Sequence, residues 1–124
     1  MKVLITENLK NLNQELEFRQ FTGTQKWYKT AFNEFYYTDG IYYLAKKYQA
    51  YWLLDIILSH QGEIRQLPFQ IWEIWSQGNQ AVVTMREDDG EPMRVRQDIN
   101  FTDFPDGYMK LYLIDKILLL PSEY

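Results

Sequence analysis

Asp55, Ser59 and His60 are the residue types of a hydrolytic triad, and all three lie in the stretch AYWLLDIILSHQ, residues 50–61. A nucleophilic serine needs its histidine base within hydrogen-bond reach. The apolar spacing of this stretch predicts a helix, on which neighbouring side chains point about 100° apart. Ser59 and His60 therefore cannot easily hydrogen-bond each other, and we assign no catalytic residue here.

Asp55 has two interpretations that depend on the face of this helix. One stripe of the helix is apolar and must meet the sheet: Ala50, Leu53, Leu54, Ile57 and Leu58. The opposite side gathers aromatic and polar residues: Tyr48, Tyr51, Trp52, Asp55 and Ser59. The favoured interpretation is that Asp55 accepts a hydrogen bond from Tyr51 or Ser59, four residues away, or from a loop packed over that face. The alternative is a semi-buried acid whose pKa is raised by desolvation into a useful range.

His60 lies with Gln49 and Ile56 at an edge of the apolar stripe. The favoured interpretation is a residue at the helix C-terminus, stabilised by the helix dipole or bonded to a carbonyl. The alternative makes His60 an acid or base that works beside Asp55.

Trp27 and Tyr28 follow the turn sequence FTGT, residues 21–24. We favour packing of these two rings on the aromatic side of the helix described above, where they close a second small core. The alternative is an aromatic-lined pocket, roofed by the FTGT loop with Asp55 at its base, for a small ligand or a partner's side chain. This pocket defines our candidate ligand- or partner-binding residues: Thr24, Trp27, Tyr28, Tyr51, Trp52, Asp55 and His60.

The chain contains no cysteine and one histidine, which excludes several kinds of metal and thiol chemistry. Zinc fingers, HExxH helices, disulfides and cysteine nucleophiles all need residues that are missing. No P-loop and no GxGxxG sequence occurs. The acidic stretch of residues 87–91 does not match the spacing of a calcium loop. We therefore predict no metal site and no cofactor.

With 124 residues, of which 46% are hydrophobic, the chain has the size of one domain with a substantial core. The net charge of −4 disfavours binding to phosphate backbones, so nucleic acid is not an expected partner. No apolar run approaches the ~18 residues of a membrane span, and the start MKVLITEN is too short for a signal peptide. Together with the lack of cysteine, these features predict a soluble cytoplasmic protein.

The N-terminal half has helical periodicity. Leucines recur at spacings of three and four over residues 6–19. Residues 39–60 form the helical centre, with Thr38 or Asp39 as the N-cap. Six aromatic residues without a clean period leave the structure of residues 25–37 undecided.

The C-terminal half changes to β-branched and aromatic segments of strand length. Predicted strands cover residues 69–76, 80–87 and 93–102, and two short strands within 110–121 are hinged at Asp115 and Lys116. Short connections that contain glycine make the first three strands antiparallel neighbours. A helical part, about 6–61, and a sheet part, about 69–120, predict one α+β domain over residues 1–124. Its N-terminal helices pack on one face of a four- to five-stranded antiparallel sheet.

The strand over residues 93–102 alternates most cleanly, with Arg94 and Arg96 on its polar side. With Lys110, these arginines could form a basic strip on the open face of the sheet. We favour an ordinary solvated strand face, because one face of an antiparallel sheet is commonly wet.

Seven short stretches of the chain together resemble a known family. They are FTGT (21–24), WY (27–28), YTDG (37–40), YWLLD (51–55), SHQ (59–61), FTDFP (101–105) and LLLPSEY (118–124). The combination is similar to a small bacterial family catalogued only as a domain of unknown function. The resemblance implies a stand-alone bacterial protein, often in plasmid, phage or other mobile contexts, and implies no activity, cofactor or catalytic residue. Members carry Asn-Gly in the last hairpin, where this chain has Asp115-Lys116, and lysine is less suited than glycine to a type I′ turn.

We therefore predict a binding or protein-interaction module of unknown biological role rather than an enzyme. Its expected contact surface is the aromatic region of Trp27, Tyr28, Tyr51, Trp52 and Asp55. The expected partner is a second copy of the chain, another protein or a small molecule. The alternative is a small enzyme or small-molecule sensor that uses Asp55 and His60. A third hypothesis, inhibition of a nucleic-acid enzyme by an acidic mobile-element protein, rests on charge and family context.

Overall fold

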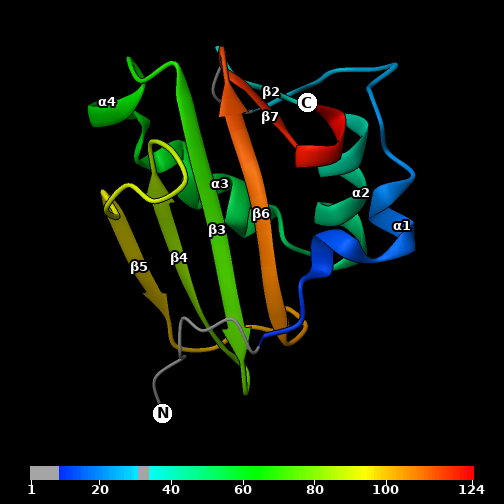
Figure 1. Ribbon diagram of the computed structural model, residues 1–124, viewed down its shortest axis with the longest axis vertical. Helices are drawn as coiled ribbons and strands as arrows, with labels where there is room; N and C mark the ends of the chain where they lie inside the picture. The colour runs from blue at the N-terminus through cyan, green and yellow to red at the C-terminus, as the bar shows by residue number, and fades with distance from the viewer. Residues whose placement is uncertain (1–8, 31–33) are drawn as a thin grey trace.

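The computed structural model describes residues 9–30 and 34–124, which form one open sheet with helices on one of its faces (Figure 1). The seven strands lie in the order β1-β2-β7-β6-β3-β4-β5. The strands are β1 (Tyr28–Lys29), β2 (Tyr36–Tyr37), β3 (Phe69–Gln77), β4 (Gln80–Arg86), β5 (Val95–Ile99), β6 (Gly107–Ile114) and β7 (Ile117–Leu119). The α-helices are α1 (Leu16–Arg19), α2 (Asp39–Lys47), α3 (Tyr51–Ser59) and α4 (Gln61–Ile64), and the 3-10 turns are η1 (Leu12–Gln14) and η2 (Pro121–Glu123).

Helices α2 and α3 meet at a tight junction that local backbone rules explain. Thr38 is the N-cap of α2, and its hydroxyl accepts a hydrogen bond from the Ile41 N–H at 3.5 Å. At the other end, Gln49 takes a left-handed conformation with a φ of 50°. This turn lets the Ala50 N–H reach the Ala45 carbonyl at 2.8 Å. The arrangement is a Schellman closure, and α3 begins directly after it.

The apolar stripe predicted for residues 50–61 is the buried face of α3. Its members are at most 5% exposed and belong to the core: Ala50, Leu53, Leu54, Ile57 and Leu58. Tyr51, Asp55 and Ser59 are exposed on the opposite side. The predicted orientation of this helix is therefore confirmed.

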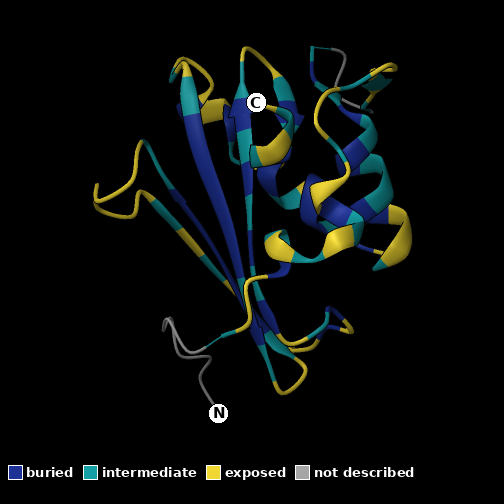
Figure 2. Cartoon of the chain, turned by 45° about the vertical axis from the view of Figure 1, so that its right-hand side comes forward, coloured by how far each residue is buried: buried dark blue, intermediate teal, exposed yellow. Residues whose placement is uncertain are grey.

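Alternate residues of the central strands pack against the helices, as the two-residue period of a strand requires. The buried side carries Trp72, Ile74, Val83, Met85, Met109 and Leu111. In Figure 2 the central strands are dark blue along most of their length, because residues on both sides of the sheet are buried in β3 and β4. The other side, called the open face below, carries Ile71, Glu73, Trp75, Tyr108, Lys110 and Tyr112, which pair across β3 and β6.

Two hairpins place non-glycine residues in left-handed backbone. Gly78 and Asn79 join β3 to β4 with φ of 62° and 64°, and Asp115 and Lys116 join β6 to β7 with φ of 50° and 68°. Positive φ at both central residues defines a type I′ turn. The hinge predicted at Asp115-Lys116 is confirmed, and the lysine does not prevent this turn type.

The segment before η1 runs along the start of β6 and requires a glycine there. The Tyr108 N–H donates to the Lys10 carbonyl at 2.7 Å. The Asn13 amide bonds both backbone groups of Lys110, at 2.7 and 3.0 Å. Gly107 has a φ of 146°, and a Cβ on it would lie 2.7 Å from the Lys10 carbonyl oxygen. Glycine alone fits this close approach.

The α+β architecture is confirmed as one sheet with helices, but the number and direction of its strands differ from the prediction. The sheet has seven strands rather than four or five, and the two-residue strands β1 and β2 lie in the stretch left undecided. β2 pairs with β7 in parallel, so the sheet is not wholly antiparallel. Within the helix predicted over residues 6–19, the described part forms η1 and the four-residue α1, and residues 6–8 lie outside the described residues.

Candidate functional site

The seven candidate residues do not form one pocket. Thr24 and Trp27 line a groove beside β7, whereas Trp52 lines a separate cleft. The other four candidates line neither cavity. The site predicted around Asp55 is therefore divided among several surfaces, which are described in turn.

Asp55 is exposed on α3, and among the residues that the structure describes its carboxylate has no hydrogen-bond or ion-pair partner. The Ser59 hydroxyl donates to the Ile56 carbonyl at 2.7 Å instead. The predicted hydrogen bond to Asp55 is thus not formed. Because Asp55 is exposed, it is not the semi-buried acid of the alternative interpretation.

His60 is the C-cap of α3, and its Nε2 lies 3.0 Å from Gln97 Oε1 on β5. Its ring is 6.0 Å from that of the buried Trp72. The residue therefore links the end of the helix to the sheet. Five residues of helix turn Asp55 and His60 about 140° apart, so the two side chains do not converge on one substrate.

Gln61, the last residue of the SHQ stretch, belongs to a buried amide network between α4 and β3. Its side chain exchanges two hydrogen bonds of 2.9 Å with the side chain of Gln70. The Trp72 indole N–H and the carbonyls of Ile57 and Ile64 complete the network at 2.9 to 3.0 Å. Every amide hydrogen-bonding group has a partner, which is the condition for burying such groups at little cost.

Tyr28 packs in a stack of three tyrosines rather than on Tyr48 and Trp52. Its ring lies 4.5 Å from Tyr42 at an interplanar angle of 7°, and 5.3 Å from Tyr37 at 18°. Burial, followed by the neighbouring Asp39 carboxylate, raises the pKa of Tyr28. The predicted second core of Tyr28 with the α3 aromatics is therefore wrong.

The N-terminus of α2 is where the FTGT, YTDG and LLLPSEY stretches meet. Thr24 accepts a hydrogen bond from the Asp39 N–H at 3.0 Å, and the Asp39 carboxylate accepts one from the Gln25 N–H at 2.9 Å. From the other direction, the Glu123 carboxylate accepts from the Thr38 hydroxyl at 2.6 Å. It also accepts from the N–H groups of Gly40 and Leu120, at 3.1 and 2.9 Å. These stretches secure a helix end, as carboxylates at a helix N-terminus commonly do.

A groove of about 230 Å³, called the Trp27–Tyr124 groove, lies on the open face beside this junction. Its floor is aliphatic: Ile114, Ile117 and Leu119. Trp27 and Tyr124 border it and are 57% and 77% exposed. Thr24, Thr38, Asp115 and Glu123 supply its polar lining.

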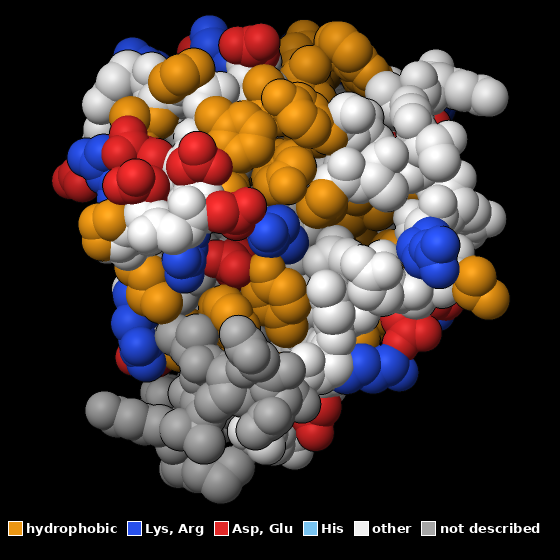
Figure 3. All heavy atoms as spheres, in the orientation of Figure 1, with side chains coloured by type: hydrophobic (Ala, Val, Ile, Leu, Met, Phe, Trp, Pro, Cys, Tyr) orange, Lys and Arg blue, Asp and Glu red, His pale blue; other side chains and the backbone are white. Residues whose placement is uncertain are grey.

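The groove continues into a cluster of three aromatic rings. Phe69, Tyr112 and Tyr124 contact one another with centroids 4.9 to 5.9 Å apart. We call the groove and cluster together the apolar patch: Trp27, Phe69, Tyr112, Ile114, Ile117, Leu119 and Tyr124. Figure 3 shows hydrophobic side chains gathered over the upper part of the open face, where β3 begins, β6 ends and β7 begins.

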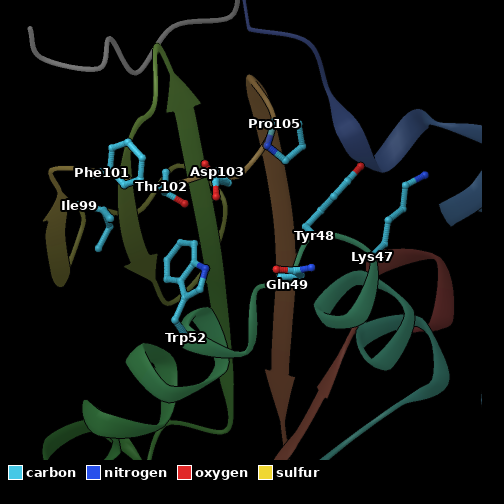
Figure 4. Close-up of a pocket in the computed structure, with 9 residues that line it drawn as sticks. All are labelled: Lys47, Tyr48, Gln49, Trp52, Ile99, Phe101, Thr102, Asp103 and Pro105. Carbon is cyan, nitrogen blue, oxygen red and sulfur yellow. The ribbon is translucent and has the colours of Figure 1, made fainter.

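A second and larger cavity, called the Trp52–Phe101 cleft, opens at the α2–α3 junction. It encloses about 760 Å³, within the ~300–1,000 Å³ of ordinary ligand sites. Its lining comes from two segments, the α2–α3 connection and the stretch after β5: Lys47, Tyr48, Gln49, Trp52, Ile99, Phe101, Thr102, Asp103 and Pro105 (Figure 4).

Phe104 and Thr102 hold the walls of this cleft in place. The buried Phe104 ring contacts Tyr48 at 5.1 Å and Trp52 at 6.4 Å, both edge to face. Thr102 accepts a hydrogen bond from the Phe104 N–H at 3.1 Å, and its own N–H donates to the Asn79 carbonyl at 2.9 Å. With these two residues turned inward, their neighbours in FTDFP, Phe101 and Asp103, are exposed at the cleft.

The charges of the open face are paired. Glu73 is 7% exposed and lies 2.9 Å from Arg86, and it accepts a hydrogen bond from the Tyr108 hydroxyl at 2.6 Å. Burial, followed by this hydrogen bond, raises the pKa of Tyr108. The three residues of the predicted basic strip each have a carboxylate partner: Arg94 with Glu87, Arg96 with Asp98 and Lys110 with Asp89. No basic strip therefore forms, as the favoured interpretation expected.

Sequence reasoning missed most residues of both cavities. Phe101 lies at the end of the strand predicted over residues 93–102, Asp103 lies just after it, and Tyr124 follows the last strand. One signal was present: Phe101 and Phe104 sit on either side of a threonine and an aspartate, FTDF, which favours one ring inward and one outward. The groove had no such signal, because its residues come from distant parts of the chain.

The fold and the cavities define a small mixed α/β protein with an open sheet, an apolar groove and a broad cleft. The chain matches the model of a family of unknown function, DUF6876, over residues 10–124, and it belongs to that family. The resemblance to a family of unknown function is thereby confirmed. No curated protein and no solved structure matches the chain.

The described ranges, 9–30 and 34–124, contain neither a membrane-spanning helix nor a cluster of metal-binding side chains. None of their helices has both the length and the apolar character needed to cross a bilayer. No group of three or more histidine, cysteine, aspartate or glutamate residues is arranged there to hold a metal ion.

Proposed function

We propose that this chain is a protein-interaction module whose contact surface is the apolar patch. The observation that carries the proposal is the exposure of Trp27 and Tyr124, at 57% and 77%, beside a groove with an aliphatic floor. A contiguous apolar surface of this kind is typical of sites where proteins bind one another. Exposed tryptophan and tyrosine also supply much of the binding energy at protein interfaces.

The groove indicates the chemistry of the partner. Its volume of about 230 Å³ is below the ~300 Å³ at which ligand pockets begin, and suits one apolar side chain. Asp115 is exposed at its rim, and the net charge of −4 favours an approaching cation. The proposed partner is therefore a protein segment that presents an apolar side chain beside a lysine or arginine.

Selection of peptides from a displayed random library tests this proposal. The wild-type chain should select peptides with an apolar residue next to a basic one. Their affinity should fall by about tenfold or more in the double variant Trp27→Ser and Tyr124→Ser. Tyr51→Ser is the matched control, because Tyr51 is 44% exposed and lies outside the patch. Peptides that bind the double variant as tightly as the wild type would refute the patch as the contact surface.

Analytical ultracentrifugation decides whether the partner is a second copy of the chain. A dimer that the same double variant dissociates would assign the patch to self-association, whose interface is the same surface on both copies. If the wild-type chain is a monomer at high concentration, the partner that binds the patch is a different protein.

The alternative enzyme or sensor built on Asp55 and His60 gains no support. Neither residue lines any of the five cavities considered in the described chain, and their side chains diverge. The cytoplasmic location, supported by the lack of cysteine, stays a prediction, as do the bacterial origin and the mobile-element association.

A further inference from the structure

We infer that the Trp52–Phe101 cleft binds a small organic cation of the alkylammonium type. This inference concerns a different site from the apolar patch. The two cavities share no lining residue. One wall of the cleft comes from residues 99–105, which precede β6, whereas the floor of the groove comes from Ile114, at the end of β6, and from β7. The two cavities therefore lie toward opposite ends of β6, and each can be tested without the other.

Aromatic rings are the first part of the argument. Tyr48, Trp52 and Phe101 all line the cleft, and Phe101 is 71% exposed. In the described part of the chain, the Phe101 ring contacts no other aromatic ring. The face of an aromatic ring carries partial negative charge, so a ring with no packing partner is available to a cation.

Charge is the second part. Asp103 lines the cleft, is exposed, and has no hydrogen-bond or ion-pair partner among residues 9–30 and 34–124. The cation of the cleft, Lys47, is already paired with Glu17. The formal charge left unpaired at the cleft is therefore negative, and the whole chain adds a net charge of −4. An anion would meet repulsion here, whereas a cation would be attracted.

Rigidity is the third part. Phe104 fixes the rings of Tyr48 and Trp52, and Thr102 anchors the segment that carries Asp103. On the other wall, the left-handed backbone of Gln49 is fixed by the hydrogen bond from the Ala50 N–H to the Ala45 carbonyl, at 2.8 Å. Walls that are fixed before binding lose little conformational entropy when a ligand enters.

Size separates an alkylammonium ion from a bare metal ion. A cavity of about 760 Å³ is far larger than one ion, and it offers one unpaired carboxylate instead of the several oxygen ligands that Ca²⁺ or Mg²⁺ require. An alkylammonium ion needs fewer polar partners, because it spreads its charge over methyl or methylene groups that contact aromatic faces.

NMR titration of the full chain with three probes tests the inference: choline, tetramethylammonium and butylammonium. The neutral control is 3,3-dimethylbutan-1-ol, which has the shape of choline without its charge. We expect choline to shift the Trp52 indole and Phe101 amide signals and to bind about fivefold or more tightly than the alcohol. Equal binding of choline and the alcohol would overturn the inference, as would the absence of shifts with all three cations.

Two carboxylate variants locate the charge that matters. Asp103→Asn should weaken choline binding by about fivefold or more, because it removes the unpaired carboxylate of the cleft. Asp55→Asn is the matched control, since Asp55 is an exposed carboxylate on the helix of Trp52 and lies outside the cleft. Choline affinity that Asp103→Asn leaves unchanged, or that both variants lower equally, would contradict the site. Amide spectra that retain the wild-type pattern show that each variant is folded.

Discussion

Lys116 holds a backbone conformation that glycine adopts at lower cost, with a φ of 68° in the turn between β6 and β7. A left-handed conformation costs a residue with a Cβ about 1–2 kcal/mol. Lys116 also pairs with Glu34 at 3.3 Å, but an exposed ion pair contributes at most about 1 kcal/mol. The cost of the left-handed backbone at Lys116 should therefore exceed the stabilisation from its ion pair with Glu34.

We predict that Lys116→Gly raises the free energy of unfolding by about 0.5–1 kcal/mol. Urea denaturation measures this change. Lys116→Ala is the control, because it removes the same ion pair and keeps the Cβ. If the glycine and alanine variants are equally stable, the left-handed conformation at residue 116 does not destabilise the protein.

Gly40 lies in the first turn of α2, where alanine would normally be the better helix residue. Here a Cβ would lie 2.5 Å from the Glu123 carboxylate oxygen, so Gly40→Ala should destabilise the chain by about 1–3 kcal/mol. Gly62→Ala, in α4, is the contrasting case, because nothing lies within 4 Å of a Cβ there. Thermal denaturation should show a lower Tm for the first variant alone. A Gly40→Ala protein as stable as the wild type would show that Glu123 moves aside freely.

At the scale of single side chains, the sequence predicted orientation better than contacts. Helical geometry placed Asp55 on the exposed side of α3, and the structure agrees. It could not show that Ser59 would bond the Ile56 carbonyl in preference to the carboxylate, because both acceptors lie within reach of a helical serine. The predicted packing of Tyr28 was wrong for a related reason. One of its stacking partners, Tyr37, lies on strand β2, which no local sequence pattern predicted.

Among the secondary-structure elements, strands β3, β4 and β6 bring Glu73, Arg86 and Tyr108 together on the open face. We predict that Tyr108→Phe lowers the free energy of unfolding by about 1–3 kcal/mol, because buried Glu73 loses a hydrogen-bond donor. Tyr112→Phe on the same strand should have little effect, since its hydroxyl bonds no group in the described chain. Equilibrium denaturation of both variants checks this difference.

The same network gives a pH dependence with a definite sign. The pKa of Tyr108 is raised in the folded state. Its contribution to the free energy of unfolding is therefore complete below about pH 10, the ordinary tyrosine pKa. Above that pH the unfolded chain ionises and the folded chain does not, so stability falls as pH rises. The free energy of unfolding, measured at pH values between 9 and 11, should fall less steeply with pH in Tyr108→Phe than in the wild type.

The loop of residues 24–26 is attached to α2 through Asp39. The Gln25 N–H and then the Thr24 and Tyr28 hydroxyls lower the pKa of Asp39. Stability from this contact is present above about 3.9, the ordinary aspartate pKa, and is lost as pH falls through the lower folded pKa. We predict that Asp39→Asn removes the stabilisation that the ionised Asp39 carboxylate provides. The free energies of unfolding of variant and wild type should therefore converge below about pH 4. Denaturation curves at pH 6 and pH 3 test it, and a constant difference at both pH values would contradict it.

The elements that the sequence predicted are those with a long local pattern. β5 and β6 alternate in burial, β3 and β4 are rich in β-branched and aromatic residues, and α3 has a full apolar stripe. The missed strands β1 and β2 have two residues each, which is too short for any period. The pairing of β2 with β7 is decided by contacts between residues about eighty positions apart, which local propensity does not contain.

For the whole molecule, Glu123 is the residue through which the C-terminal turn η2 stabilises the N-terminus of α2. Its carboxylate accepts three hydrogen bonds from Thr38, Gly40 and Leu120. We predict that Glu123→Ala costs at least about 2 kcal/mol, because bonds to a charged group contribute about 1.5–3 kcal/mol each. Hydrogen exchange should accelerate at the first amides of α2 before it does in β3. Glu123→Gln, which keeps an acceptor oxygen, should show a smaller effect.

The parallel pairing of β2 with β7 also constrains the order in which the protein acquires its structure during synthesis. Tyr36 and Tyr37 pair on one side with Tyr28 and Lys29, which are synthesised before them, but on the other side with Ile117 and Leu118. Domains in general fold as units once their parts are available, and distant pairings form slowly. The nascent chain should therefore hold the β1–β2 pair unattached to the rest of the sheet until β7 has been synthesised. During that interval the pair is open to chaperones, and it joins the sheet only after residues 117–123 emerge.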